Sequence, residues 1–155
     1  MYEDRSGDLL DDLVAAAGHR VSRRAVVPDD PAALTSLLRA LADGGDIDLI
    51  LTTGGTGISP TDSTPEATEA ACDRIVPGIA EAVRAASLAS TPHAMLSRST
   101  AGTRGATLVV NLPGSPGGAR DGWAVIAPIV AHAVSQLAGG DHPRPSGAGS
   151  GSGAG

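Results

Sequence analysis

The stretch Thr52-Thr53-Gly54-Gly55-Thr56-Gly57 directly follows the apolar run from Ile47 to Leu51. Asp62 comes next, and then Ser63-Thr64-Pro65-Glu66, which has the hydroxyl, early proline and carboxylate typical of a helix start. A strand, a glycine turn and a helix start in this order present backbone N–H groups to phosphate. The stretch predicts either a phosphate-binding turn or simply a tight strand–helix connection. It matches neither a Walker loop nor the dinucleotide-binding fingerprint.

The composition restricts the class of protein. The chain has 155 residues, enough for one domain, and 41% of them are hydrophobic. It contains no Phe, one Trp and one Tyr, so its core must be built from Ala, Val, Leu and Ile, which suits helices packed on a parallel sheet. The net charge of −6 argues against a nucleic-acid surface, and no apolar run approaches the roughly 20 residues of a membrane helix. The single Cys72 cannot form an internal disulfide. We therefore expect a cytoplasmic α/β protein with no nucleic-acid and no membrane partner.

Hydrophobic periodicity predicts alternating helices and strands along most of the chain. Strands are expected at 21–27, 47–51 and 107–111, and the order strand, helix, strand implies a right-handed parallel crossover. Helices are expected at 7–17, 31–43, 64–75, 79–88 and 119–137, with a polar loop at 97–102. Asp30 is expected to cap the second helix, and Cys72 to be a small core residue within the third. The composition predicts one domain at 1–138 and a disordered Gly/Ser/Pro-rich tail at 139–155.

Three polar segments should meet where the buried strands end. Ligands of open parallel sheets bind at the carboxyl ends of the strands, which places 28–30, 52–62 and 111–116 at one edge. Asp29 and Asp62 could hold Mg²⁺ together with phosphate oxygens, or could be ordinary turn residues and caps. Ser97 and Arg98 could bind an anion or form an ordinary polar loop.

Several ordered motifs carry a resemblance to a known family. They are Tyr2-Glu3-Asp4-Arg5-Ser6-Gly7, Leu51 to Gly57, Asp62 to Thr68, Met95-Leu96-Ser97-Arg98-Ser99, Gly102, Arg104-Gly105 and Asn111-Leu112-Pro113-Gly114-Ser115-Pro116. In this order and spacing they resemble the molybdopterin adenylyltransferase family, the Mog/MoaB group that also includes a gephyrin domain. The resemblance covers the chain from residue 2 to about residue 138.

The resemblance implies a three-layer α/β/α fold around a mostly parallel sheet, usually trimeric, in molybdenum cofactor biosynthesis. The family reaction joins molybdopterin to the adenylyl group of Mg-ATP and releases pyrophosphate, and a molybdenum-insertion protein would act downstream. By motif, Asp29 and Asp62 match the catalytic and Mg²⁺-handling carboxylates. The residues implied to bind nucleotide or pterin are Thr53, Gly54, Gly55, Thr56, Gly57, Glu66, Ser97, Arg98, Gly102, Asn111, Pro113, Gly114 and Ser115. The alternative is a non-catalytic molybdopterin-binding or scaffold protein of the same family.

The chain departs from the family pattern at its start. Family members begin with a buried strand ahead of the Tyr-x-Asp motif, whereas this chain begins at Met1-Tyr2, inside that motif. Either Met1 is an internal residue of a longer protein or the domain lacks one strand. The first is favoured, because loss of a buried strand would expose the apolar faces of its neighbours. An upstream extension is therefore expected to restore soluble expression.

Overall fold

The structure is a computed structural model in which residues 3–139 are described. Its elements are α1 (Arg5–Ala16), α2 (Pro31–Asp43), β1 (Leu49–Thr53), α3 (Thr64–Ala71), β2 (Arg74–Ile75), α4 (Pro77–Leu88), the 3₁₀ helix η1 (Pro92–Leu96), β3 (Ala101–Arg104), β4 (Thr107–Leu112) and α5 (Pro116–Leu137). The expected tail lies outside the described residues, apart from Gly139. Within the described range, no helix has the length and apolar character needed to span a membrane.

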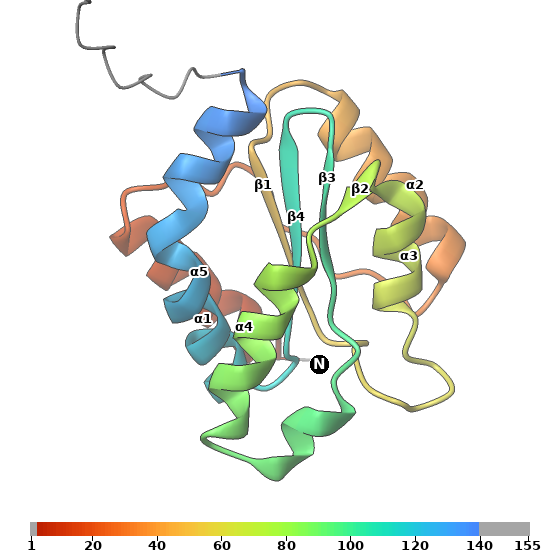
Figure 1. Cartoon of the computed structure of the whole chain (residues 1–155). Coiled ribbons are helices and arrows are strands. Elements are labelled where there is room, and N and C mark those ends of the chain that lie inside the picture. The colour runs from red at the N-terminus through yellow and green to blue at the C-terminus, as the bar shows by residue number, and fades with distance from the viewer. Residues whose placement is uncertain (1–2, 140–155) are drawn as a thin grey trace, which may run out of the picture.

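The helices cover both faces of one four-stranded sheet. The strand order is β1-β4-β3-β2, with β1 and β4 parallel and the other two pairings antiparallel. Helices α1, α4 and α5 lie on one face, and α2 and α3 lie on the other (Figure 1). The expected three-layer α/β/α fold is confirmed, although the sheet is mixed and only the β1–β4 pairing is parallel.

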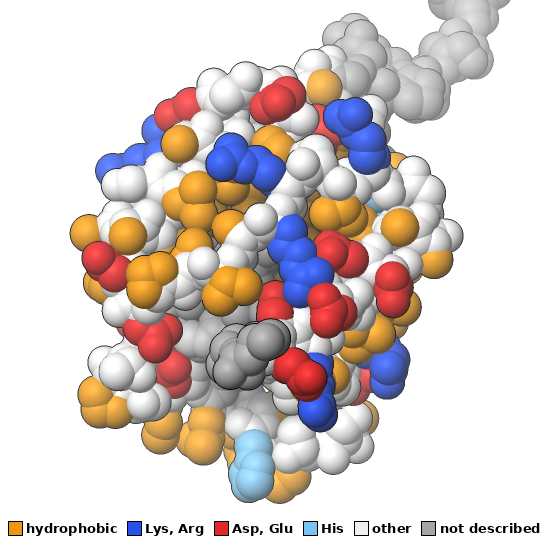
Figure 2. Space-filling view, turned by 180° about the vertical axis from the view of Figure 1, so that it is seen from behind, with side chains coloured by type: hydrophobic (Ala, Val, Ile, Leu, Met, Phe, Trp, Pro, Cys, Tyr) orange, Lys and Arg blue, Asp and Glu red, His pale blue; other side chains and the backbone are white. Residues whose placement is uncertain are grey.

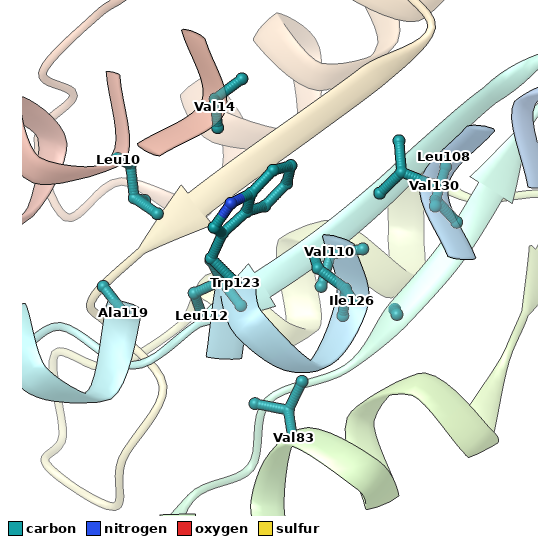
Figure 3. Close-up of a cluster of buried hydrophobic side chains, with 11 residues drawn as sticks. Leu10, Val14, Val83, Leu108, Val110, Leu112, Ala119, Trp123, Ile126 and Val130 are labelled. Carbon is teal, nitrogen blue, oxygen red and sulfur yellow. The ribbon is translucent and has the colours of Figure 1, made fainter. Parts of the chain in front are cut away.

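Strand β4 forms the centre of both cores. All six of its residues are buried, and alternate side chains point to opposite faces. Leu108, Val110 and Leu112 join the larger cluster with α1, α4 and α5, and Trp123 of α5 lies among them (Figure 3). Val109 joins the smaller cluster with α2 and α3. An aliphatic core built around one tryptophan therefore fixes the position of β4 and of the loop that follows it.

The region after the glycine turn differs from the prediction. Helix α3 ends at Ala71 rather than near residue 75, because Cys72 is extended and the next residues form β2. Pro77, expected to break a helix, instead occupies the first turn of α4. Ser63 precedes α3 but makes no side-chain capping bond. Cys72 is thus the residue that ends α3, and burial raises the pKa of its half-buried thiol.

Strand β3 was also missed, because its start falls in the expected polar loop at 97–102. Its four residues include a glycine and carry no apolar run, so local pattern gives no strand signal. The strand forms because it lies between β4 and β2, and Gly102 allows this close packing. A Cβ on Gly102 would lie 2.5 Å from the carbonyl oxygen of Arg74 and 2.8 Å from Sγ of Cys72.

The strand predicted at 21–27 is wrong. Residues 21–27 have no regular secondary structure and are exposed, and Val26 is 69% accessible. The segment is held to α1 through Arg24, which forms ion pairs with Asp4, Asp8 and Asp11. Without this strand, the parallel crossover expected between 21–27 and β1 is not formed.

The physical reason is the absence of a neighbouring strand. Among the described residues, β1 pairs only with β4, so its other edge is open. A cavity of about 1220 Å³ is lined both by residues 19–30 and by residues 46–55. The back of the molecule shows hydrophobic side chains gathered in a hollow of the surface (Figure 2). Without a neighbouring strand, 21–27 has no ladder hydrogen bonds to form, so its three valines do not make it a strand.

Candidate functional site

The glycine turn links β1 directly to α3. Gly54 and Gly55 have φ angles of 83° and 66°, which L side chains rarely adopt. The amide of Thr64, the first residue of α3, donates to the carbonyl of Gly55 at 3.1 Å. A Cβ on Gly55 would lie only 2.3 Å from Oγ1 of Thr64. At Gly55, both the backbone conformation and the lack of space for a side chain therefore require glycine.

A second loop lies against this turn. Register pairs Thr53 with Leu112, so β1 and β4 end at the same edge of the sheet. The amide of Gly54 donates to the carbonyl of Leu112 at 3.3 Å, and a Cβ on Gly114 would lie 3.0 Å from Cα of Gly54. Gly114 and Ser115 are exposed. The edge therefore presents two adjacent backbone loops that substrate phosphate can approach closely.

Asp62 is held in a defined position next to the glycine turn. Its Oδ2 accepts from the amide of Ser59 at 3.1 Å, and its own amide donates to the carbonyl of Ser59 at 2.9 Å. A Cβ on Gly57 would lie 2.9 Å from Oδ2, so the turn and the carboxylate are in direct proximity. The half-buried side chain makes no described protein hydrogen bond through Oδ1 within residues 3–139. That oxygen is free to meet a ligand.

The loop at 97–99 adjoins the same turn. The amide of Arg98 donates to the carbonyl of Thr56 at 2.7 Å, and its guanidinium pairs with Glu66 of α3. The hydrogen bond from Arg98 holds the pKa of the Glu66 carboxyl below its ordinary value. The Ser97 hydroxyl donates to that of Ser99 at 3.1 Å. Arg98 and Glu66, predicted as ligand-binding residues, are thus in contact with each other.

Asp29 lies in an exposed loop between the segment at 21–27 and α2. It is itself exposed and lines the same cavity as Thr52–Gly55. Its neighbour Asp30 caps α2 as expected, with Oδ1 accepting from the amides of Ala32 and Ala33. No contact joins Asp29 to Asp62 among the described side-chain hydrogen bonds and ion pairs.

Two predicted binding residues are buried within the fold. Asn111 is 1% exposed, and its amide nitrogen donates to Thr52 at 2.9 Å and to Thr68 at 2.8 Å. Its amide oxygen accepts from the amide of Thr100 at 3.2 Å. Gly102 lies within β3, paired with Val109. Asn111 therefore connects β1, α3 and the residue just before β3 beneath the site rather than lying on its surface.

Two residues that support the site were missed by the sequence prediction. Arg84 of α4 donates to the carbonyls of Ser97 and Ser99, both at 3.0 Å. Ser6 of α1 donates through its hydroxyl to the carbonyl of Gly114 at 2.7 Å. Ser6 lies in the motif from Tyr2 to Gly7 that carries the resemblance, whereas Arg84 lies in no such motif, and neither has a local signal for these contacts, which cross 13 to 108 residues of chain.

The carboxylates of the site are candidate ligands for a metal ion. Within residues 3–139, no three His, Cys, Asp or Glu side chains cluster in a way that could hold a metal ion. Mg²⁺ does not require such a cluster, because it commonly uses one or two carboxylates together with substrate phosphates. Asp62, with one described oxygen free, fits that type of ligand.

Comparison with known proteins places this arrangement in a family. The family described as "Probable molybdopterin binding domain" matches residues 1–132. A curated molybdopterin adenylyltransferase of Helicobacter pylori is 35% identical over 141 residues, covering 90% of this chain and 80% of that protein. The solved structure of MoaB from Thermus thermophilus is 45% identical, with a TM-score of 0.82 and coverage of 89% and 87%. The Mog protein from Mycobacterium ulcerans is also 45% identical, with a TM-score of 0.82 and coverage of 88% and 89%. The chain belongs to the family of molybdopterin-binding domains found in molybdenum cofactor biosynthesis proteins.

Proposed function

We propose that the protein is a molybdopterin adenylyltransferase that uses Mg-ATP. A terminal phosphate oxygen of molybdopterin attacks the α-phosphorus of ATP, the bond between the α-phosphorus and the bridging oxygen breaks, and pyrophosphate leaves. The observation that carries this proposal is the approach of Gly54 to Gly114 at the end of the parallel β1–β4 pair, beside Asp62. Two phosphate-bearing substrates need two adjacent backbone surfaces, which this edge provides.

Each part of the site has a role in positioning charge. The amides of the exposed residues Gly114 and Ser115, and those of the glycine turn other than Gly54, bind phosphate oxygens, with Ser97 close to the same edge. Asp62, together with Asp29, would hold Mg²⁺, which supplies neutralisation of phosphate charge when it is bound. Because phosphoryl-type transfer depends mainly on positioning and electrostatics, no covalent nucleophile on the protein is required.

The test is incubation of the purified protein with molybdopterin and Mg-ATP. Adenylylated molybdopterin and pyrophosphate should appear in equal amounts, as measured by chromatography and a pyrophosphate assay. ATP withheld, or Mg²⁺ removed by a chelator, should abolish both products. Molybdopterin bound without product would instead support the non-catalytic binding or scaffold role.

The assembly and later steps belong to the same proposal. We propose a homotrimer, as implied by the resemblance, and transfer of the adenylylated product to a molybdenum-insertion protein. The sedimentation coefficient measured at several concentrations tests the trimer. A monomer across that range would contradict it.

A further inference from the structure

The guanidinium of Arg98 donates to the protein through each of its three nitrogens. Its Nε donates to the carbonyl of Gly57 at 2.7 Å, and its Nη2 donates to the carbonyl of Asp62 at 2.9 Å. Its Nη1 pairs with the carboxylate of Glu66. Each of the three nitrogens thus has a protein acceptor. An arginine that binds phosphate through its planar fork normally directs two of these donors to the ligand.

These contacts close a loop at its two ends. The segment 57–62 leaves the glycine turn and returns to α3, and residues 58–61 between its ends are exposed. Arg98 bonds to the carbonyls of the first and last residues of this segment, and Glu66 ties it to the first turn of α3. The carboxylate of Asp62 lies on this segment, so its position depends on how firmly the segment is closed.

The loop that carries Arg98 is itself held from the other side. Arg84 of α4 donates to the carbonyls that flank Arg98, those of Ser97 and Ser99. The amide of Arg98 donates to the carbonyl of Thr56. A continuous set of hydrogen bonds therefore runs from α4 through the 97–99 loop to segment 57–62 and α3.

We propose that Arg98 and Glu66 are positioning residues: they clamp segment 57–62 so that Asp62 is fixed before substrate arrives. The clamp is a structural feature of the free protein, and its effect on turnover rests on the proposed function. The lowered pKa of the Glu66 carboxyl agrees with a persistent pair at neutral pH.

The experiment compares R98K, E66Q and the double variant with wild type, and uses R104K as a matched control. Arg104 makes the same kinds of contact elsewhere, an ion pair with Asp43 and a bond to the carbonyl of Ala71. Amide hydrogen exchange in the ligand-free protein should quicken at 57–62 in R98K and E66Q by about tenfold or more, and should be unchanged there in R104K. This readout does not depend on activity.

Turnover supplies the second readout. R98K and E66Q should lower kcat by about tenfold or more and change the KM for molybdopterin less than about threefold. The double variant should be little worse than either single variant, because both break one clamp. Normal exchange at 57–62 in both variants would overturn the proposal. So would a raised KM in R98K with kcat unchanged and E66Q fully active, since that pattern identifies a phosphate ligand. Quickened exchange with no turnover even in wild type would uphold the clamp and contradict only the proposed function.

Discussion

Strand β4 and the segment at 21–27 both have a strand signal in sequence but differ in structure. Both contain β-branched residues, although 21–27 also carries Ser22, Arg23 and Arg24. β4 lies between β1 and β3, and all its residues are buried, whereas residues 21–27 are exposed and unpaired beside the open edge of β1. β-propensity therefore produces a strand only where neighbouring strands supply backbone partners and both faces are covered.

The same contrast divides the candidate site. Asp62 follows β1 and is held by Ser59, while Arg98 bonds to its carbonyl. Asp29 follows the unpaired segment and is exposed. One half of the site is therefore fixed by the folded core, and the other half depends on a segment that has no strand beside it.

The largest expected effect is a loss of turnover, and it should differ between Asp62 and Asp29. Asp62→Asn should lower turnover by about 100-fold or more while leaving molybdopterin binding nearly intact, because it removes charge from a fixed position at the reacting phosphates. Asp29→Asn should cost less, because its carboxylate is not held in place. Steady-state kinetics and a molybdopterin-binding titration measure both. Loss of binding in Asp62→Asn with normal turnover per bound substrate would refute the assigned role.

The second prediction compares stability on the two sides of the sheet. Leu112→Ala, in the core at the end of β4, should lower the free energy of unfolding by about 2–5 kcal/mol through lost burial and a cavity. Val26→Ala, at a residue 69% exposed, should change it by less than about 0.5 kcal/mol. Urea denaturation of both variants provides the measurement. Similar losses at both positions would mean that 21–27 is packed in solution.

Much of the fold was predictable because its signals are local. Strands β1 and β4, the cap of α2 by Asp30 and the glycine turn all follow from neighbouring residues. Strand β3 and the short β2 were missed because they exist only through pairing. In the site, the order of the motifs was enough to predict that the glycine turn, Asp62 and the Gly114 loop lie close together. The engagement of Arg98 could not be predicted, since its partners lie 32 to 41 residues away along the chain.

The third prediction is that a strand added beside β1 allows 21–27 to pair as β4 does. An apolar strand of about six residues, joined by a polar loop ahead of residue 1, should pair with the open edge of β1 and give 21–27 a partner. Because α1 begins near Gly114, at the carboxyl end of the sheet, the added strand would run parallel to β1. We expect greater soluble yield and a Tm higher by at least about 5 °C, since one kcal/mol corresponds to about 2–8 °C in domains of this size.

The matched control carries proline at the centre of the added strand, which removes a ladder hydrogen bond while keeping length and hydrophobicity. It should give little of the gain. Amide exchange at 49–53 should slow only with the proline-free extension. Equal solubility, oligomeric state and melting with and without the extension would count against an added strand at this edge.

The smallest expected effect concerns how the unpaired segment is tied to α1. The amide of Gly7, and then Arg24, hold the pKa of Asp4 below its ordinary value of 3.8. A carboxyl whose pKa is lower in the folded state stabilises the protein above its unfolded pKa and loses that contribution as the pH falls through the folded value.

Asp4→Asn keeps a side-chain acceptor for the Gly7 amide but cannot titrate. Its unfolding free energy should therefore fall less steeply than that of wild type below about pH 4. Arg24→Gln should flatten the same curve only in part, because Arg24 is the lesser cause of the shift. Urea denaturation at successive pH values measures the slopes, and identical slopes for Asp4→Asn and wild type would show that Asp4 and Arg24 do not couple the segment to α1 in solution.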